Sequence, residues 1–338
     1  MTESHPLGPS VRRVLLEEVQ IDRHLSRNTQ CSYRDTMRLL LRFMEDHHAT
    51  AATRVTVEQI TLELVRHFLT FLEQERHNAP ATCNQRRAAL HSLFRFIARQ
   101  TPELVEHAAQ IHALPTRRTV APVIDYLEKD ELEAVLAVPD RRHAQGQRDY
   151  ALLLFLYNTG ARASEAAHTT VDALRLNDPS SVRLVGKGGK TRVCPLWPRT
   201  AMTLQTLLGS RRSVPPDAPV FLNVRGQPLT RFGIHTLVER IVAKAAAALP
   251  TLASKNISPH TVRHTTAVHL LRAGVDINTI RAWLGHVSLA TTTRYAQVDV
   301  AMKAKALATC EIRESTESPG SAPSWRTDDQ LMAFLTAL

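Results

Sequence analysis

The sequence predicts a mainly α-helical protein with one small β-hairpin, built as a helical N-terminal domain followed by a mixed α+β domain. Three observations support this fold class. Apolar residues recur at helical spacing through 11–112 and again from 127 to 284. One pair of alternating β-branched runs flanks a glycine-rich turn at 181–196. The chain has 338 residues, more than one core usually spans, so we expect two domains.

The first domain, expected at 1–118, is predicted to contain helices only. Clear amphipathic helices are expected at 33–47, 62–74 and 82–99. The segment 112–123 holds two prolines and an Arg pair without a clear period, which is typical of a linker.

The helix expected at 82–99 carries polar side chains away from its apolar face. Asn84, Arg86, Arg87 and Arg95 are the candidates there for contacts with a phosphate backbone. An ordinary solvated surface explains the same residues equally well, so both interpretations stay open.

The second domain is expected at 119–310. Its predicted helices are 127–136, 149–159, 163–168, 199–208, 230–248, 259–273 and 277–284. The hairpin at 181–196 turns at Gly186, and 220–229 is a candidate for a second short hairpin. We expect 311–338 to be a flexible linker followed by a short amphipathic helix at 327–338.

The charge distribution favours a polyanionic partner. The net charge is +10, and residues 119–310 hold 24 Lys+Arg against 14 Asp+Glu. Aromatic residues are only 5% of the chain, so base-stacking platforms for single strands are not expected and duplex DNA fits better than RNA. A solvated basic surface without a partner is the alternative.

Other features exclude several classes of protein. No apolar run reaches the ~20 residues that a membrane helix needs, and the N-terminus does not resemble a secretion signal. The four cysteines are widely spaced, so we expect reduced, mostly buried thiols, no disulfide framework and no zinc site. These features predict a cytoplasmic protein associated with the nucleoid.

Four short motifs carry the candidate chemistry. Arg162 and Glu165 are three residues apart, so on a helix they face together and the carboxylate can hold the guanidinium. The glycine-rich turn offers Lys187, with Lys190 as a substitute and as a further candidate for contact with DNA. His260 and Arg263 are likewise three residues apart. The fourth motif is Leu284-Gly285-His286 followed by Tyr295. Each motif alone has a plain structural explanation: an ion pair, a basic turn, a packed histidine or a half-buried tyrosine.

Together and in this order, the motifs resemble those of the tyrosine recombinases, also called phage-type or Xer-like integrases. The strings GARASE, GKGGKTR, HTVRHT and LGH…TTTRY carry this resemblance, which covers about residues 26–300. It implies that the helical front segment is a core-binding, SAM-like domain and that the rest is the family's catalytic domain.

The resemblance implies cleavage of duplex DNA through a 3′-phosphotyrosyl intermediate. Arg162 and Arg263 would clamp the nonbridging oxygens of the phosphate, and Tyr295 would attack the phosphorus. Lys187 would protonate the departing 5′ oxygen, and His260 or His286 would take the phenolic proton; which histidine does so stays open. No cofactor, metal or ATP is implied.

The implied partners are duplex DNA with inverted-repeat recombination sites and other copies of the chain, as a tetramer in the synaptic complex. Accessory recombinases are possible partners. The segment exchanged between subunits is either 298–310 or 327–338. The departures at the C-terminus favour an integrase of a mobile element; alternatives are a chromosome or plasmid dimer resolvase, a topoisomerase, a catalytically silent DNA-binding regulator and a helical adaptor.

Overall fold

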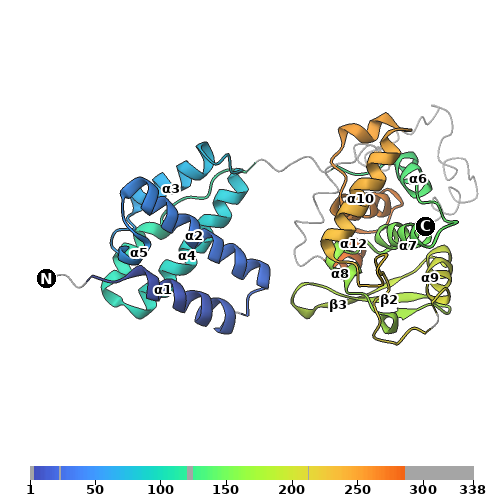
Figure 1. The fold of residues 1–338 in the computed structure, drawn as a ribbon, viewed down its shortest axis with the longest axis horizontal. Coiled ribbons are helices and arrows are strands. Elements are labelled where there is room, and N and C mark those ends of the chain that lie inside the picture. Colours follow the sequence, from blue (N-terminus) through green and yellow to red (C-terminus); the bar gives the residue numbers. More distant parts are fainter. Residues whose placement is uncertain (1–3, 23, 120–124, 212, 286–338) are drawn as a thin grey trace, which may run out of the picture. The chain divides into compact units, whose positions relative to one another are not determined.

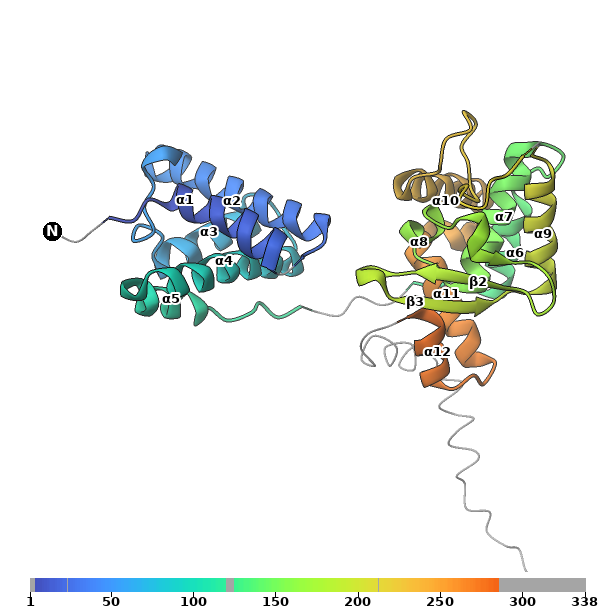
Figure 2. The same ribbon diagram turned by 90° about the horizontal axis from the view of Figure 1, so that it is seen from below.

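The computed structural model describes residues 4–22, 24–119, 125–211 and 213–285. The chain divides into two compact units, one from Met1 to Val123 and the other from Ile124 to Leu338. Each is drawn with the elements labelled in Figures 1 and 2. The domain limits expected from the sequence, 1–118, 119–310 and 311–338, stay predictions, and the last of them lies outside the described residues.

The described elements of the first unit are helices, as the periodicity predicts, apart from a single bridge between Pro6 and Thr56. Its α-helices are α1 (Leu7–Arg13), α2 (Arg27–His48), α3 (Leu62–Gln74), α4 (Pro80–Gln100) and α5 (Val105–His112). A π-helical stretch spans Val14–Asp22, and short 3-10 turns lie at Ala52–Arg54 and Pro102–Leu104.

Local side chains fix where these helices begin. The Ser26 hydroxyl accepts a hydrogen bond from the Thr29 amide at the start of α2, and Thr61 does the same for Leu64 at the start of α3. Pro80 is the first residue of α4, where its missing N–H costs no hydrogen bond. Leu40, Phe43, Phe68, Leu90, Leu93 and Phe94, among others, form the core of this unit.

The second unit packs helices against one face of a small antiparallel sheet, whose strands alternate between buried and exposed residues. The helices are α6 (Lys129–Ala137), α7 (Ala144–Thr159), α8 (Ala163–Ala167), α9 (Pro198–Gly209), α10 (Arg231–Ala246), α11 (Pro259–Arg272) and α12 (Ile277–Leu284). Short 3-10 turns lie at Val171–Ala173, Lys187–Gly189 and Pro250–Ser254. The strands are β1 (Leu174–Arg175), β2 (Ser181–Val185) and β3 (Thr191–Pro195), in the spatial order β1-β2-β3.

The hairpin predicted at 181–196 is confirmed. Arg183 lies opposite Val193, and Val185 lies opposite Thr191. The second candidate hairpin, at 220–229, is reduced to a single bridge between Leu222 and Pro228 around a turn. Strand β1 was not expected, because two residues give no readable alternation.

Helix α7 lies at the centre of the second unit. Most of its residues are buried, and it packs against α9 and α11. It ends at Gly160, which takes the left-handed conformation (φ 58°) that the sequence leads one to expect of a glycine at a helix end. A side chain on Gly160 would collide with Leu284, since its Cβ would come 2.4 Å from Cδ2. The ends of α7 and α12 are therefore in direct contact.

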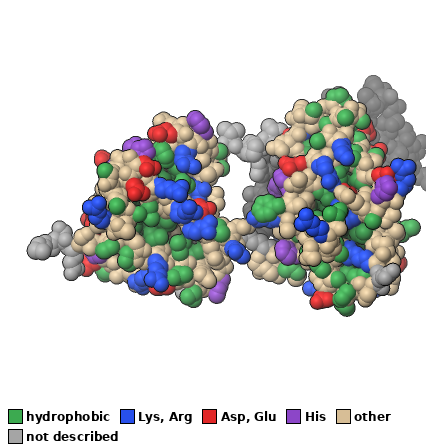
Figure 3. All heavy atoms as spheres, viewed as in Figure 1, with side chains coloured by type: hydrophobic (Ala, Val, Ile, Leu, Met, Phe, Trp, Pro, Cys, Tyr) green, Lys and Arg blue, Asp and Glu red, His purple; other side chains and the backbone are tan. Residues whose placement is uncertain are grey.

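Basic side chains are spread over the face of the molecule shown in Figure 3, with fewer acidic ones among them. Within the ranges described, no helix is both long and apolar enough to cross a bilayer. Cys31, Cys83 and Cys194 are free thiols, and the latter two are buried.

Candidate active site

Arg162 and Glu165 meet at the start of α8, as their spacing predicts. Arg162 is the N-cap residue of this helix, and its Nη1 donates to Glu165 Oε1 at 2.7 Å. The Arg162 amide donates to Glu165 Oε2 at 2.8 Å. The carboxylate therefore caps the helix and holds the guanidinium at the same time.

This is not the surface ion pair of the plain structural explanation. The Glu165 side chain is only 2% exposed, and each of its oxygens accepts two hydrogen bonds, one from Arg162 and one from Arg192. Burial by itself would raise the pKa of Glu165. The hydrogen bonds from Arg192 and from the Arg162 amide outweigh burial and lower this pKa to about 2.

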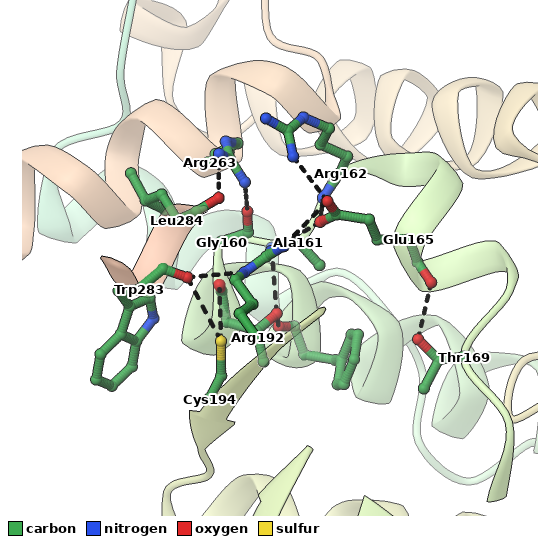
Figure 4. A network of polar contacts seen from close by, with 12 residues as sticks. Gly160, Ala161, Arg162, Glu165, Thr169, Arg192, Cys194, Arg263, Trp283 and Leu284 are labelled. Atoms are coloured by element: carbon green, nitrogen blue, oxygen red, sulfur yellow. Dashed lines mark hydrogen bonds and ion pairs between the residues drawn. The ribbon is translucent and has the colours of Figure 1, made fainter. Parts of the chain in front are cut away.

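Arg263, on α11, is among the largest fully buried side chains described. Its Nη1 donates to the Gly160 carbonyl at 2.7 Å, and its Nη2 donates to the Leu284 carbonyl at 2.5 Å. Both acceptors lie at the C-terminal ends of helices, where backbone carbonyls lack helical partners. Arg263 thereby joins the ends of α7 and α12 (Figure 4). Its acceptor Gly160 is two residues before Arg162 in the chain.

The turn between β2 and β3 comes close to this pair. A Cβ on Gly186 would lie 3.1 Å from Glu165 Oε1 and 3.9 Å from Arg162 Nη1. Lys187 follows Gly186 directly, so its backbone is held beside Arg162, although its side chain is outside what the structure describes. Gly188 and Gly189 both have positive φ, which the tight turn requires, and Lys190 is exposed.

His260 lies on the surface at the start of α11 and shares a pocket of about 450 Å³ with Arg162. Its ring centre is 4.3 Å from that of His264. The pocket is lined by Arg162, Ala163, Ser164, Arg231, Phe232, His235, Ser258, Pro259 and His260. The Ser258 hydroxyl caps α11 by accepting from the Thr261 amide, which fixes the first turn that carries His260.

The structure adds Arg192, a residue that the sequence analysis did not single out. It lies on β3, with its Nη1 and Nη2 donating to Oε1 and Oε2 of Glu165 at 3.0 and 2.7 Å. Its Nε donates to the Trp283 carbonyl at 2.8 Å. One signal could have found it: Arg192 falls on the same face of the alternating strand as the buried Cys194, and a charge on a buried face needs a partner.

Two of the predicted site residues, His286 and Tyr295, lie outside the described residues. Both follow α12 in the chain, and the Leu284 carbonyl bound by Arg263 is two residues before His286. Of the predicted site residues, the structure therefore brings together Arg162, Glu165 and Arg263 with the backbone of Lys187, and His260 with Arg162.

The residues proposed for DNA contact on α4 have internal partners. Asn84 exchanges two hydrogen bonds with the backbone of Arg117, and Arg86 donates to Ser32 and Thr36. Arg87 donates to the Leu114 carbonyl. These contacts explain three of the four polar residues without DNA, whereas Arg95 is exposed; contact with phosphate stays a prediction.

Arg263 binds the carbonyl of Gly160, two residues before Arg162, and guanidiniums suit an oxyanion with several charged oxygens. The imidazole of His260 lines the adjoining pocket, and an imidazole is a group that can accept or donate a proton. The family model for the phage integrase family matches residues 125–302, and that for the N-terminal SAM-like domain of phage integrases matches residues 14–101. The chain belongs to the phage integrase family of tyrosine recombinases.

Known relatives agree with this assignment. The recombinase is 35% identical to y4rC of Sinorhizobium fredii, a protein inferred to be an integrase/recombinase, over the full length of both chains. It is 32% identical to the tyrosine recombinase XerC of Pelobacter propionicus, covering 87% of this chain and 92% of the relative.

Solved structures show the same fold. The integrase of the Tn1549 transposon, in complex with a circular-intermediate DNA, matches with a TM-score of 0.69 at 18% identity and covers 89% of this chain and 99% of that one. XerH bound to its difH substrate matches with a TM-score of 0.64 at 22% identity, covering 84% of this chain and 78% of that one.

Proposed function

We propose that this recombinase cleaves and rejoins duplex DNA at specific sites, with Tyr295 as the nucleophile that forms a 3′-phosphotyrosyl bond. The observation that carries the proposal is the fixed pair of arginines. Arg263 binds the carbonyl of Gly160, and Arg162 is two residues further along the same segment. Family membership makes a DNA phosphate the expected oxyanion.

The reaction needs charge stabilisation and two proton transfers. In-line attack on a phosphodiester gives a five-coordinate species with about two negative charges, which its oxygens carry. Arg162 and Arg263 would neutralise the nonbridging oxygens. The tyrosine hydroxyl has an ordinary pKa near ~10, so His260 or His286 would accept its proton as the O–P bond forms. Lys187, on the turn beside Arg162, would donate a proton to the departing 5′ oxygen.

The second half of the reaction reverses the first. A 5′ hydroxyl of the partner duplex attacks the phosphotyrosine, the new phosphodiester forms, and Tyr295 leaves with a proton returned to it. The energy of the broken bond is conserved in the phosphotyrosine, so the scheme requires no ATP and no metal.

We further propose that the recombinase serves a mobile element and acts in the cytoplasm on the DNA of the nucleoid, as a tetramer on two inverted-repeat sites. The match to y4rC extends over the whole chain, including residues 311–338, whereas the match to XerC leaves 13% of the chain uncovered. The XerC relatives keep a dimer resolvase as the alternative.

Covalent trapping tests the chemistry. Duplexes taken from the DNA that flanks the gene, nicked so that the 5′ fragment diffuses away after cleavage, are incubated with wild type and Tyr295→Phe and run on a denaturing gel without added metal. We expect a protein–DNA band in wild type that Tyr295→Phe lacks and that Tyr33→Phe, a tyrosine of the other unit, retains. Tight binding with no band in wild type would favour the silent DNA-binding regulator.

A cellular assay separates the two biological roles. Cells carry the gene with its natural flanks on a plasmid. Sequencing of junctions detects excised circles, and the ratio of plasmid monomers to dimers measures resolution. Circle junctions that depend on Tyr295 support the mobile element. Resolution of dimers without circles supports the resolvase.

A further inference from the structure

Arg192 joins three of the sequence motifs that the fold brings together. It belongs to the GKGGKTR string on β3, its two Nη atoms bind Glu165 of the GARASE string, and its Nε binds the carbonyl of Trp283, just before Leu284-Gly285-His286. Figure 4 shows the Arg192 side chain lying between α8 and the end of α12. No other described residue makes hydrogen bonds to both Glu165 and α12.

We propose that Arg192 is a positioning residue for the phosphate clamp: it fixes the Glu165 carboxylate that orients Arg162, and it fixes the end of α12 that leads to His286. This role rests on the proposed function, in which Arg162 binds the scissile phosphate. In this scheme Arg192 acts through its contacts with Glu165 and with the Trp283 carbonyl, to which Nε, Nη1 and Nη2 donate.

The effect on Arg162 follows from how Glu165 is shared. The two oxygens of Glu165 accept four hydrogen bonds, two of them from Arg192. Without those two, the carboxylate can rotate about its side-chain torsions to satisfy its empty lone pairs, and Arg162 would follow it. The side chain of Arg162 is 36% exposed and lines the pocket with His260. Among its described contacts, the hydrogen bond to the Glu165 carboxylate is the one that fixes its guanidinium.

The neighbouring glycines show how closely the parts fit. A Cβ on Gly285 would lie 3.2 Å from Arg192 Cδ, and a Cβ on Gly186 would lie 3.1 Å from Glu165 Oε1. A displacement of Glu165 would therefore also move Gly186, in the turn that carries Lys187. A displacement of Arg192 would move Gly285, the residue before His286. A lysine cannot replace Arg192, because its ammonium group is a single point charge. The guanidinium of Arg192 reaches both carboxylate oxygens of Glu165 and the carbonyl of Trp283.

The experiment compares Arg192→Lys with a matched buried arginine. Arg148 on α7 is also 9% exposed in its side chain, and its Nε binds Asp149 at 2.6 Å. It donates to a backbone carbonyl, that of Leu222, but none of its described hydrogen bonds is made with a residue of the site. Single-turnover cleavage of the nicked duplex is measured at saturating enzyme, together with the affinity for the same duplex and the unfolding midpoint. Partial unfolding then changes the amplitude of cleavage and not its rate.

We expect Arg192→Lys to lower the cleavage rate about 100-fold, the size of effect that a misplacement of about 1 Å produces, with DNA affinity nearly unchanged. Arg148→Lys should destabilise the protein to a similar degree and retain the wild-type rate. Equal rates for Arg192→Lys and wild type, or equal losses in both variants, would overturn the positioning role.

A double-mutant cycle shows whether Arg192 acts through Glu165. If the part of the effect that concerns Arg162 runs through Glu165, Glu165→Gln combined with Arg192→Lys loses less than the sum of the two single losses. Any loss beyond that of Glu165→Gln alone then measures the contact with the Trp283 carbonyl. Fully additive losses would overturn the role of Arg192 on Glu165. If wild type forms no Tyr295-dependent adduct, the proposed function itself fails; if the adduct forms and Arg192→Lys is normal, only the positioning role fails.

Discussion

Gly285 lies against the side chain of Arg192, so closely that a methyl group on Gly285 would have to push Arg192 aside. A Cβ on Gly285 would stand 3.2 Å from Cδ and 3.4 Å from Nη1 of Arg192. Gly285 also has a φ of +65°, which side chains disfavour. Two features therefore favour glycine at position 285: the left-handed backbone conformation and the close contact with Arg192.

Gly285→Ala should therefore destabilise the second unit and slow cleavage. The left-handed conformation costs an alanine about 1–2 kcal/mol, and the contact with Arg192 adds to this. Urea unfolding followed by tryptophan fluorescence measures the loss, because residues 1–123 contain no tryptophan, whereas Trp197 and Trp283 lie in the second unit. Gly209→Ala, at the end of α9 with open space and no positive φ, is the control and should be as stable as wild type or more stable by up to about 1 kcal/mol. A similar stability for both alanine variants would contradict this account.

Glu165→Gln should lower the free energy of unfolding by about 3–5 kcal/mol near neutral pH, as the removal of one partner from a buried ion pair does. The loss should depend on pH. Because the folded pKa of about 2 lies below the ordinary value of 4.5, the stabilisation by Glu165 is complete above pH 4.5 and disappears as the pH falls towards 2.

Parallel urea titrations of wild type and Glu165→Gln between those pH values measure this difference, which should shrink by about 3 kcal/mol. Asp140→Asn removes an exposed carboxylate whose pKa is also lowered by the hydrogen bond from Arg142, so it should change the pH dependence in the same direction but less, because solvent screens this pair. A difference that stays constant down to pH 2 would argue against the low pKa of Glu165.

The arginines of α4 should divide into two kinds. Arg87→Gln removes a hydrogen bond to the Leu114 carbonyl and should destabilise the first unit, with little change in the salt dependence of DNA binding. Arg95 is exposed, so Arg95→Gln should leave stability unchanged and reduce the slope of log affinity against log salt by about one. Fluorescence anisotropy across a salt titration measures the slope, and the opposite pattern would place Arg87 on the DNA.

His91 should remain neutral well below the pH at which most histidines gain a proton. Burial lowers its pKa to about 4, helped by the positive charge of Arg87 and the nearby ring of His112, whose centre is 4.6 Å away. The unfolded chain takes up a proton between pH 6.5 and 4 where the folded chain does not, so the first unit loses stability as the pH falls through this range.

NMR titration of the imidazole resonances measures the His91 pKa directly, with His91→Gln assigning the signal. That variant should also remove this part of the pH dependence of unfolding. A His91 ring that titrates near pH 6.5 would contradict the prediction.

The sequence predicted most helices within a few residues, since local periodicity and capping residues fix them. Helix α3 begins and ends at the predicted residues, Leu62 and Gln74, and α12 likewise spans Ile277–Leu284. Helix α7 begins five residues earlier than expected, at Ala144, because its first turn is polar and carries no apolar signal. The bridge at Leu222 and Pro228 is too short for alternation to distinguish from a loop.

By itself, the sequence determined the helical fold class, the hairpin and the order of the motifs that identify a tyrosine recombinase, because all of these depend on neighbours in the chain. Only the tertiary structure decided that Glu165 is a buried carboxylate shared by two arginines, that Arg263 binds the ends of α7 and α12, and that Arg192 belongs to this network. These contacts join residues 21 to 103 positions apart, except for the Arg162–Glu165 pair. Their geometry follows from how helices and sheet pack, which no local pattern specifies.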